Sequence, residues 1–116
     1  MPLEIVYLDD EIGLCETFTD NLSSKEVAIK TFVSPDEAVK YIAANPPDLI
    51  FLDYRLPNTS GFEVALRIKG QMPMALISGH LSLKLQPPFV KIFPKPFDFA
   101  EMEAFIQSYV DLKKVV

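Results

Sequence analysis

Residues 47–57 read PDLIFLDYRLP, and this stretch decides the fold. Its four consecutive apolar residues, 49–52, follow two prolines and end at Asp53. A short apolar run that does not alternate with polar residues is typical of a central strand covered on both faces. We therefore predict a buried strand that carries Asp53 to one edge of a sheet.

Similar runs occur elsewhere in the chain, rich in β-branched and aromatic residues, and we predict strands there too. They cover residues 3–8, 27–32, 74–77 and 90–93. Helical patterns separate them. The predicted helices run from Ile12 to Leu22, from the cap Ser34 to about Ala44, from Ser60 to Lys69, and onward from Asp98. The Pro35-Asp36-Glu37 sequence after Ser34, and Glu63 three residues after Ser60, are typical helix starts.

This alternation of strands and helices predicts a parallel sheet with helices on both faces. In such sheets the functional crevice lies beyond the carboxyl ends of the strands. Polar residues follow four of the five predicted strands at that point. They are Asp9-Asp10-Glu11, Asp53, Ser78-Gly79-His80 and Lys95.

Length and composition restrict the class of protein. A chain of 116 residues with 49% apolar and 23% charged residues indicates one globular domain, residues 1–116. The net charge of −5 argues against a nucleic-acid surface. The apolar runs are too short for a membrane helix, and Glu4 and Asp9 do not suit a signal peptide. We expect a cytoplasmic protein without disulfides, because Cys15 is the only cysteine.

The acidic residues predict a site for a hard cation. If the sheet forms, Asp9, Asp10 and Asp53 converge, and two carboxylates about 4 Å apart repel by about 4 kcal/mol at an effective dielectric of 20. Mg²⁺ prefers such oxygen ligands and also binds phosphate oxygens. Lys95 would add a positive charge and Ser78 a hydroxyl donor. Taken singly, Asp10 fits a helix cap, Asp53 a turn, and Ser78 and Lys95 solvated loops.

The chain from residue 3 to about 112 resembles a receiver domain of a bacterial two-component response regulator. The matching stretches are VYLDDE at 6–11, PDLIFLDYRLP at 47–57, NTSG at 58–61 and KPF at 95–97. The resemblance implies a flavodoxin-like five-stranded parallel sheet in the order 2-1-3-4-5. It also implies a phosphoryl-accepting signalling module, not a dedicated enzyme, that phosphorylates and dephosphorylates itself with Mg²⁺.

The same resemblance implies individual roles. Asp53 would be the phospho-acceptor, with Asp10 a direct Mg²⁺ ligand, Asp9 assisting through water, and the Arg55 backbone carbonyl completing the protein ligands. In addition, Ser78 would be the hydroxyl switch, and Lys95, before a cis Pro96, the phosphoryl contact. A sensor histidine kinase or phosphotransfer protein would supply the phosphoryl group to act on a downstream protein target. A homodimer is left open, and no output domain is expected in this chain.

Two departures from the family pattern lie between Ser78 and Lys95. Only seventeen positions separate them, and Pro87-Pro88 follows Leu81–Gln86, so we expect the fourth helix to be short or replaced by a loop. Ile92 occupies the position where the family usually places an aromatic switch residue, and the adjacent Phe93 should point to the opposite face. We therefore expect retained chemistry with an unusual signalling face.

Other functions remain open on the residues alone. A small Mg²⁺-dependent aspartyl phosphatase would usually carry an Asp where Arg55 stands, and a flavodoxin-like electron carrier would need a phosphate loop in place of Asp9-Asp10-Glu11. A phosphate-independent degenerate receiver is a further alternative. Beside the site, Tyr54 and Arg55 are candidates to gate access to Asp53. His80 is better explained as a surface residue, and Cys15 as a buried small hydrophobe.

Overall fold

The protein is described here by a computed structural model covering residues 1–80 and 82–115. Five parallel strands form one twisted sheet in the order β2-β1-β3-β6-β7. The strands are β1 (Leu3–Leu8), β2 (Val27–Phe32), β3 (Leu49–Asp53), β6 (Met74–Ser78) and β7 (Phe89–Pro94). The predicted fold, with its 2-1-3-4-5 strand order, is therefore confirmed.

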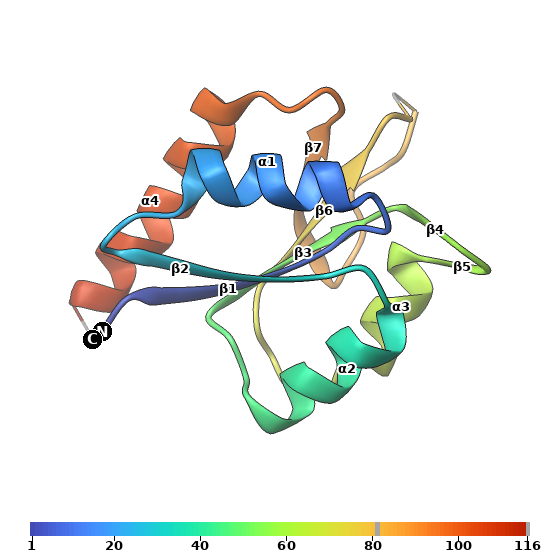
Figure 1. The fold of residues 1–116 in the computed structure, drawn as a ribbon, viewed down its shortest axis with the longest axis horizontal. Helices are drawn as coiled ribbons and strands as arrows, with labels where there is room; N and C mark the ends of the chain where they lie inside the picture. Colours follow the sequence, from blue (N-terminus) through green and yellow to red (C-terminus); the bar gives the residue numbers. More distant parts are fainter. Residues whose placement is uncertain (81, 116) are drawn as a thin grey trace.

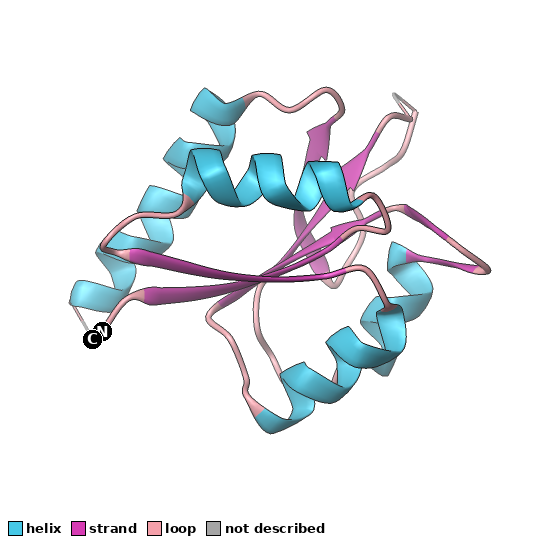
Figure 2. Cartoon of the chain, in the orientation of Figure 1, coloured by secondary structure: helices cyan, strands magenta, loops and turns pink. Residues whose placement is uncertain are grey.

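Helices cover both faces of the sheet (Figure 1). One face carries α1 (Ile12–Leu22) and α4 (Phe99–Lys114), and the other carries α2 (Pro35–Ala44) and α3 (Gly61–Arg67). Figure 2 shows the sheet as the middle of three layers. No helix in the described ranges is long and apolar enough to cross a membrane.

The central strand β3 shows why the sequence makes this fold. All five of its residues are buried, as the unbroken apolar run predicts. Leu49 and Phe51 pack into the core layer under α1 and α4, while Ile50 and Leu52 pack into the layer under α2 and α3. Because alternate residues of a strand face opposite sides, one short run fills both layers and fixes Asp53 at the strand end.

The starts of α2 and α3 follow the sequence signals, but the predicted end of α3 is wrong and so is the alternative interpretation of Asp10 as a helix cap. The hydroxyls of Ser34 and Ser60 accept the N–H groups of the residues three positions on, which caps α2 and α3. However, α3 ends at Arg67 instead of Lys69, because Ile68 turns to extended backbone and packs into the core. Asp10 does not cap α1, whose N-cap position is Glu11 with no side-chain hydrogen bond.

A short antiparallel pair, β4 (Arg55–Leu56) and β5 (Thr59–Ser60), follows Asp53 and was not predicted. Its turn places Asn58 at a φ of 61°, a left-handed conformation that asparagine tolerates well. The pair leads the chain directly from the end of β3 into α3.

The segment between β6 and β7 has no helix in residues 82–88, as expected from Pro87-Pro88. Leu81, part of that expectation, lies outside the described residues. The bond between Lys95 and Pro96 is cis, as the resemblance implies, and so is the bond between Pro87 and Pro88. Phe93 is buried under α4 while Ile92 packs on the opposite layer, so the predicted opposition of these two side chains is confirmed.

Candidate functional site

The carboxyl ends of the parallel strands bring the predicted site residues together. Asp9 follows β1, Asp53 ends β3, Ser78 ends β6 and Lys95 follows β7. Carboxylate oxygens of Asp9, Asp10 and Asp53 lie within 4.8 Å of one another. The site therefore contains three carboxylates and one lysine, gathered from three strand ends.

Lys95 connects the two buried carboxylates. Its Nζ lies 2.9 Å from Oδ1 of Asp53 and 3.3 Å from Oδ2 of Asp9. Desolvation lowers the pKa of the Lys95 ammonium, but the hydrogen bond to Asp53 and the charge of Asp9 outweigh it and raise that pKa above its usual value. Lys95 thus stays a full positive charge facing Asp53.

Asp53 itself has an unusual protonation equilibrium. Its side chain is only 6% exposed, and burial raises the pKa of the carboxyl from 3.8 to about 6 in the metal-free protein. The charge of Asp9 acts in the same direction, whereas the hydrogen bond from Lys95 lowers the pKa. Near neutral pH, Asp53 is a carboxylate with a basic, poorly solvated oxygen, which suits a nucleophile.

This shift predicts how stability depends on pH in metal-free buffer. Between about pH 4 and 6 the folded protein holds a proton on Asp53 that the unfolded chain releases, so the free energy of unfolding falls as pH rises through this window. Asp53→Asn removes the effect, which amounts to about 3 kcal/mol at most for two pKa units. In EDTA at pH 7.5, we expect the melting temperature of Asp53→Asn to lie at least about 4 °C above that of the wild type.

Thermal unfolding followed by circular dichroism at several pH values checks this expectation. The difference in melting temperature between Asp53→Asn and the wild type should become smaller toward pH 4. A variant melting at or below the wild-type temperature at pH 7.5 would contradict the raised pKa.

Asp9 is fully buried and accepts three hydrogen bonds. Its Oδ1 accepts the N–H of Glu11 at 3.0 Å, while its Oδ2 accepts from Lys95 and from the hydroxyl of Tyr7. Desolvation and the hydrogen bond to Asp9 raise the pKa of Tyr7 far above its usual value, so the phenol keeps its proton and acts as donor.

Tyr7 could not be recognised as a site residue from the sequence, because it is one of several apolar residues in β1. The available signal was its spacing, since residues two apart on a strand share a face and Tyr7 precedes Asp9 by two. The contact itself depends on the ring position, which only the tertiary packing determines.

Ser78 and its neighbours line a cleft beside Asp53. The cleft has a volume of about 350 Å³, and its walls include Tyr54, His80 and Lys95. The hydroxyl of Ser78 is buried and accepts the backbone N–H of His80 at 2.9 Å. The rings of Tyr54 and His80 meet edge to face, 5.5 Å apart. His80 is exposed yet belongs to the cleft, so it lies closer to the site than the sequence suggested.

The donor set fits a hard divalent cation. Three convergent carboxylates, one exposed and two buried, carry more negative charge than Lys95 balances. Mg²⁺ takes one or two carboxylates and keeps several waters, which suits a cluster whose Asp10 is exposed to solvent. Arg55, whose backbone carbonyl is the further expected ligand, lines the same cleft.

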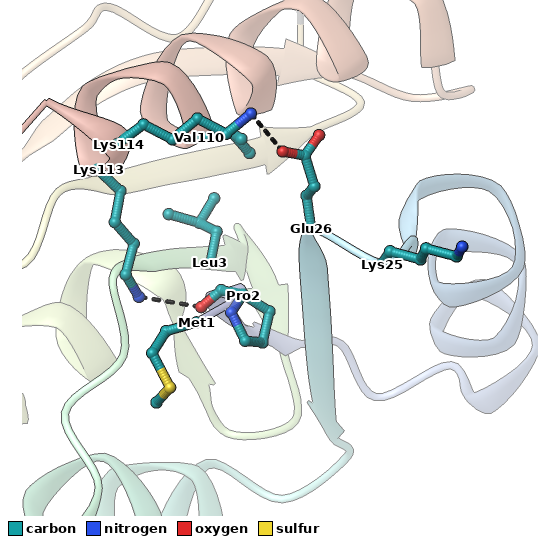
Figure 3. Close-up of a pocket in the computed structure, with 8 residues that line it drawn as sticks. All are labelled: Met1, Pro2, Leu3, Lys25, Glu26, Val110, Lys113 and Lys114. Atoms are coloured by element: carbon teal, nitrogen blue, oxygen red, sulfur yellow. Dashed lines mark hydrogen bonds and ion pairs between the residues drawn. The ribbon is translucent and has the colours of Figure 1, made fainter.

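A larger cavity of about 550 Å³ lies at the opposite edge of the sheet, beside the two chain termini (Figure 3). Its lysines are engaged within the protein: Lys113 contacts the carbonyl of Pro2 and the carboxylate of Asp48, and Lys114 pairs with Glu26. Asp9, Asp10 and Asp53 do not line it. Of the other sequence candidates, Cys15 is buried and burial raises the pKa of its thiol to about 11, which suits an unreactive core residue.

Fold and site together define a class: doubly wound, flavodoxin-like α/β proteins with an acidic cluster at the carboxyl edge of the sheet. Comparison with known proteins narrows this class. The family model of the response regulator receiver domain matches residues 5–107. The chain therefore belongs to the response regulator receiver domain family, whose members are signalling modules of two-component systems.

Relatives and solved structures agree with this assignment. Response regulator MprA from Mycobacterium sp. (strain KMS) is 27% identical over 93% of this chain and 50% of its own length. The chain thus spans about half the length of this relative. A CheY-like receiver domain from Methylobacillus flagellatus superposes with a TM-score of 0.84 at 21% identity, covering 94% and 99% of the two chains.

The response regulator protein TrrA from Thermotoga maritima, solved in complex with Mg(2+)-BeF, is also similar. It has a TM-score of 0.82 at 25% identity and covers 94% of this chain and 99% of its own.

Proposed function

We propose that Asp53 accepts a phosphoryl group from a histidine kinase or a phosphotransfer protein. The observation that carries the proposal is the contact of Lys95 with Asp53 inside the cluster of three carboxylates. An oxygen of Asp53 attacks phosphorus, the bond from phosphorus to the donor's histidine nitrogen breaks, and the electron pair returns to that nitrogen. The product is an acyl phosphate.

In this proposal, Asp9, Asp10, Asp53 and the backbone carbonyl of Arg55 hold Mg²⁺, with Asp9 assisting through water. The bound ion would offset the charge of the phosphoryl oxygens. Lys95 would form an ion pair with the phosphoryl group on Asp53, because its Nζ already lies 2.9 Å from the accepting carboxylate. Hydrolysis by water later removes the phosphoryl group, so the domain resets itself.

Signalling would begin at Ser78. Its hydroxyl now accepts the N–H of His80, and we propose that it leaves this turn to donate to the phosphoryl group. The absence of helix in residues 82–88 and the aliphatic Ile92 make the neighbouring face unlike the usual family pattern. We propose that residues 1–116 act as a receiver unit in the cytoplasm, through contact of this altered face with a downstream protein.

Intact-protein mass spectrometry tests the chemistry. The protein is incubated with a small phosphodonor, with and without Mg²⁺, beside Asp53→Asn and the matched control Asp20→Asn, an exposed aspartate on α1. We expect one phosphoryl adduct that needs Mg²⁺, persists in the control and disappears in Asp53→Asn. If neither the small donor nor a histidine kinase produces an adduct on the folded protein, the domain acts without phosphate.

A further inference from the structure

We propose that Tyr7 is a positioning residue. In the metal-free site its hydroxyl stabilises the carboxylate of Asp9, as the cation would do when bound, and it thereby weakens Mg²⁺ binding. The inference deepens the proposed function and rests on it. It starts from one contact: the Tyr7 hydroxyl donates to Oδ2 of Asp9, the oxygen that also faces Lys95.

The ring of Tyr7 is held from two sides. It is fully buried, stacks on Phe18 of α1 with centroids 4.3 Å apart, and meets the edge of Phe97 at 6.4 Å. Because the packed ring leaves the hydroxyl little freedom, the donor is aimed at Asp9 before any ion binds. Asp9 in turn lies on the same strand face, two residues further along the chain.

The charges of the site explain why this donor matters. Three carboxylates face one lysine, and Lys95 divides its contacts between Asp9 and Asp53. A buried carboxylate that loses one of its donors bears part of its desolvation cost uncompensated. Tyr7 supplies a neutral donor to Asp9, which lets Lys95 remain at 2.9 Å from Asp53 in the absence of an ion.

A donor that stabilises the metal-free state more than the metal-bound state weakens ion binding by that difference in free energy, because the two equilibria form one thermodynamic cycle. The bound cation would balance the charge of Asp9, so the Tyr7 hydroxyl contributes less once the ion is present. Without the hydroxyl, Asp9 is left under-compensated and the site becomes more negative. Binding of Mg²⁺ then also stabilises the under-compensated carboxylate of Asp9, so the affinity for Mg²⁺ rises. A structural aromatic without this role would change stability equally with and without the ion.

The test compares Tyr7→Phe with the wild type by isothermal titration calorimetry of MgCl₂ into metal-free protein at pH 8, and by melting temperature against Mg²⁺ concentration. We expect roughly tenfold tighter Mg²⁺ binding, since a hydrogen bond to a charged group is worth this much or more. The melting temperature should fall without Mg²⁺ and recover as the ion is added. The control Ile42→Val removes buried packing in the opposite core layer and leaves the Tyr7 hydroxyl and its ring contacts in place, so its melting temperature should fall equally at every Mg²⁺ concentration.

Equal or weaker Mg²⁺ binding by Tyr7→Phe, or a variant that stays unfolded at all Mg²⁺ concentrations, overturns the inference. If the wild type binds Mg²⁺ and forms the adduct, and Tyr7→Phe binds Mg²⁺ with the same affinity, only the proposed role of Tyr7 is wrong. If the wild type does not bind Mg²⁺ at all, the metal part of the proposed function fails as well.

Discussion

Lys95→Met is expected to reduce the rate of phosphorylation of Asp53 by about a hundredfold or more, while the protein still binds Mg²⁺. Lys95 is the cation in contact with the carboxylate of Asp53, at 2.9 Å, and methionine keeps much of its apolar stem without the charge. The incoming phosphoryl oxygens would lose a charged partner in a site that is largely withdrawn from water. Losing one such preorganised donor typically costs this much in rate.

The same substitution should not weaken the binding of Mg²⁺, in contrast to its effect on phosphorylation. Lys95 competes with a divalent cation for Asp9 and Asp53, so its removal leaves three carboxylates with no positive neighbour among the contacts described. We expect unchanged or tighter Mg²⁺ binding by calorimetry alongside the loss of adduct. Slower phosphorylation without weaker Mg²⁺ binding would indicate a chemical role for Lys95. General damage to the site would instead weaken both phosphorylation and Mg²⁺ binding.

The control is Lys91→Met on β7, since Lys91 pairs with Glu101 away from the acidic cluster. Its phosphorylation rate should stay near that of the wild type. Lys95→Met forming adduct within about threefold of the wild-type rate would remove Lys95 from the proposed mechanism.

Part of this site could be predicted because topology, and not side-chain detail, brings it together. Parallel strands end at one edge, so an apolar run followed by an acidic residue places that residue at the edge without any knowledge of packing. The same placement applies to any polar residue that follows such a run, and Asp9, Asp53, Ser78 and Lys95 are all placed in this way. The lack of helix in residues 82–88 was predictable as well, because Pro87-Pro88 acts locally on the backbone.

The remainder depends on tertiary contacts that no local pattern encodes. The end of α3 is set by Ile68, which leaves the helix to fill the core, although the sequence before Gly70 continues to favour helix. The link from Tyr7 to Asp9 needs the ring to be held by Phe18 and Phe97, residues distant in the sequence. The turn in which Ser78 accepts the N–H of His80 likewise depends on backbone geometry that residue types do not specify.

Gly61→Ala is expected to destabilise the protein by about 1–3 kcal/mol and to slow phosphorylation as well. A Cβ at Gly61 would lie 2.7 Å from the backbone carbonyl oxygen of Asp53 and 2.7 Å from Cδ1 of Leu76. The Leu76 side chain can rotate away, but the carbonyl belongs to the end of β3. Relief of the clash must therefore shift either the start of α3 or the strand end that carries the phospho-acceptor candidate.

Gly13→Ala provides a matched control, because Gly13 lies in α1 and a Cβ there meets nothing within 4 Å. In that helix, alanine should stabilise by up to about 1 kcal/mol. Chemical denaturation and intact-mass phosphorylation should then separate the two variants, with Gly13→Ala at or above wild-type stability and Gly61→Ala below it. If Gly61→Ala were as stable as the wild type, α3 would have room to move away from Asp53. The close packing of α3 against the end of β3 would then not be what fixes the carboxylate of Asp53 in place.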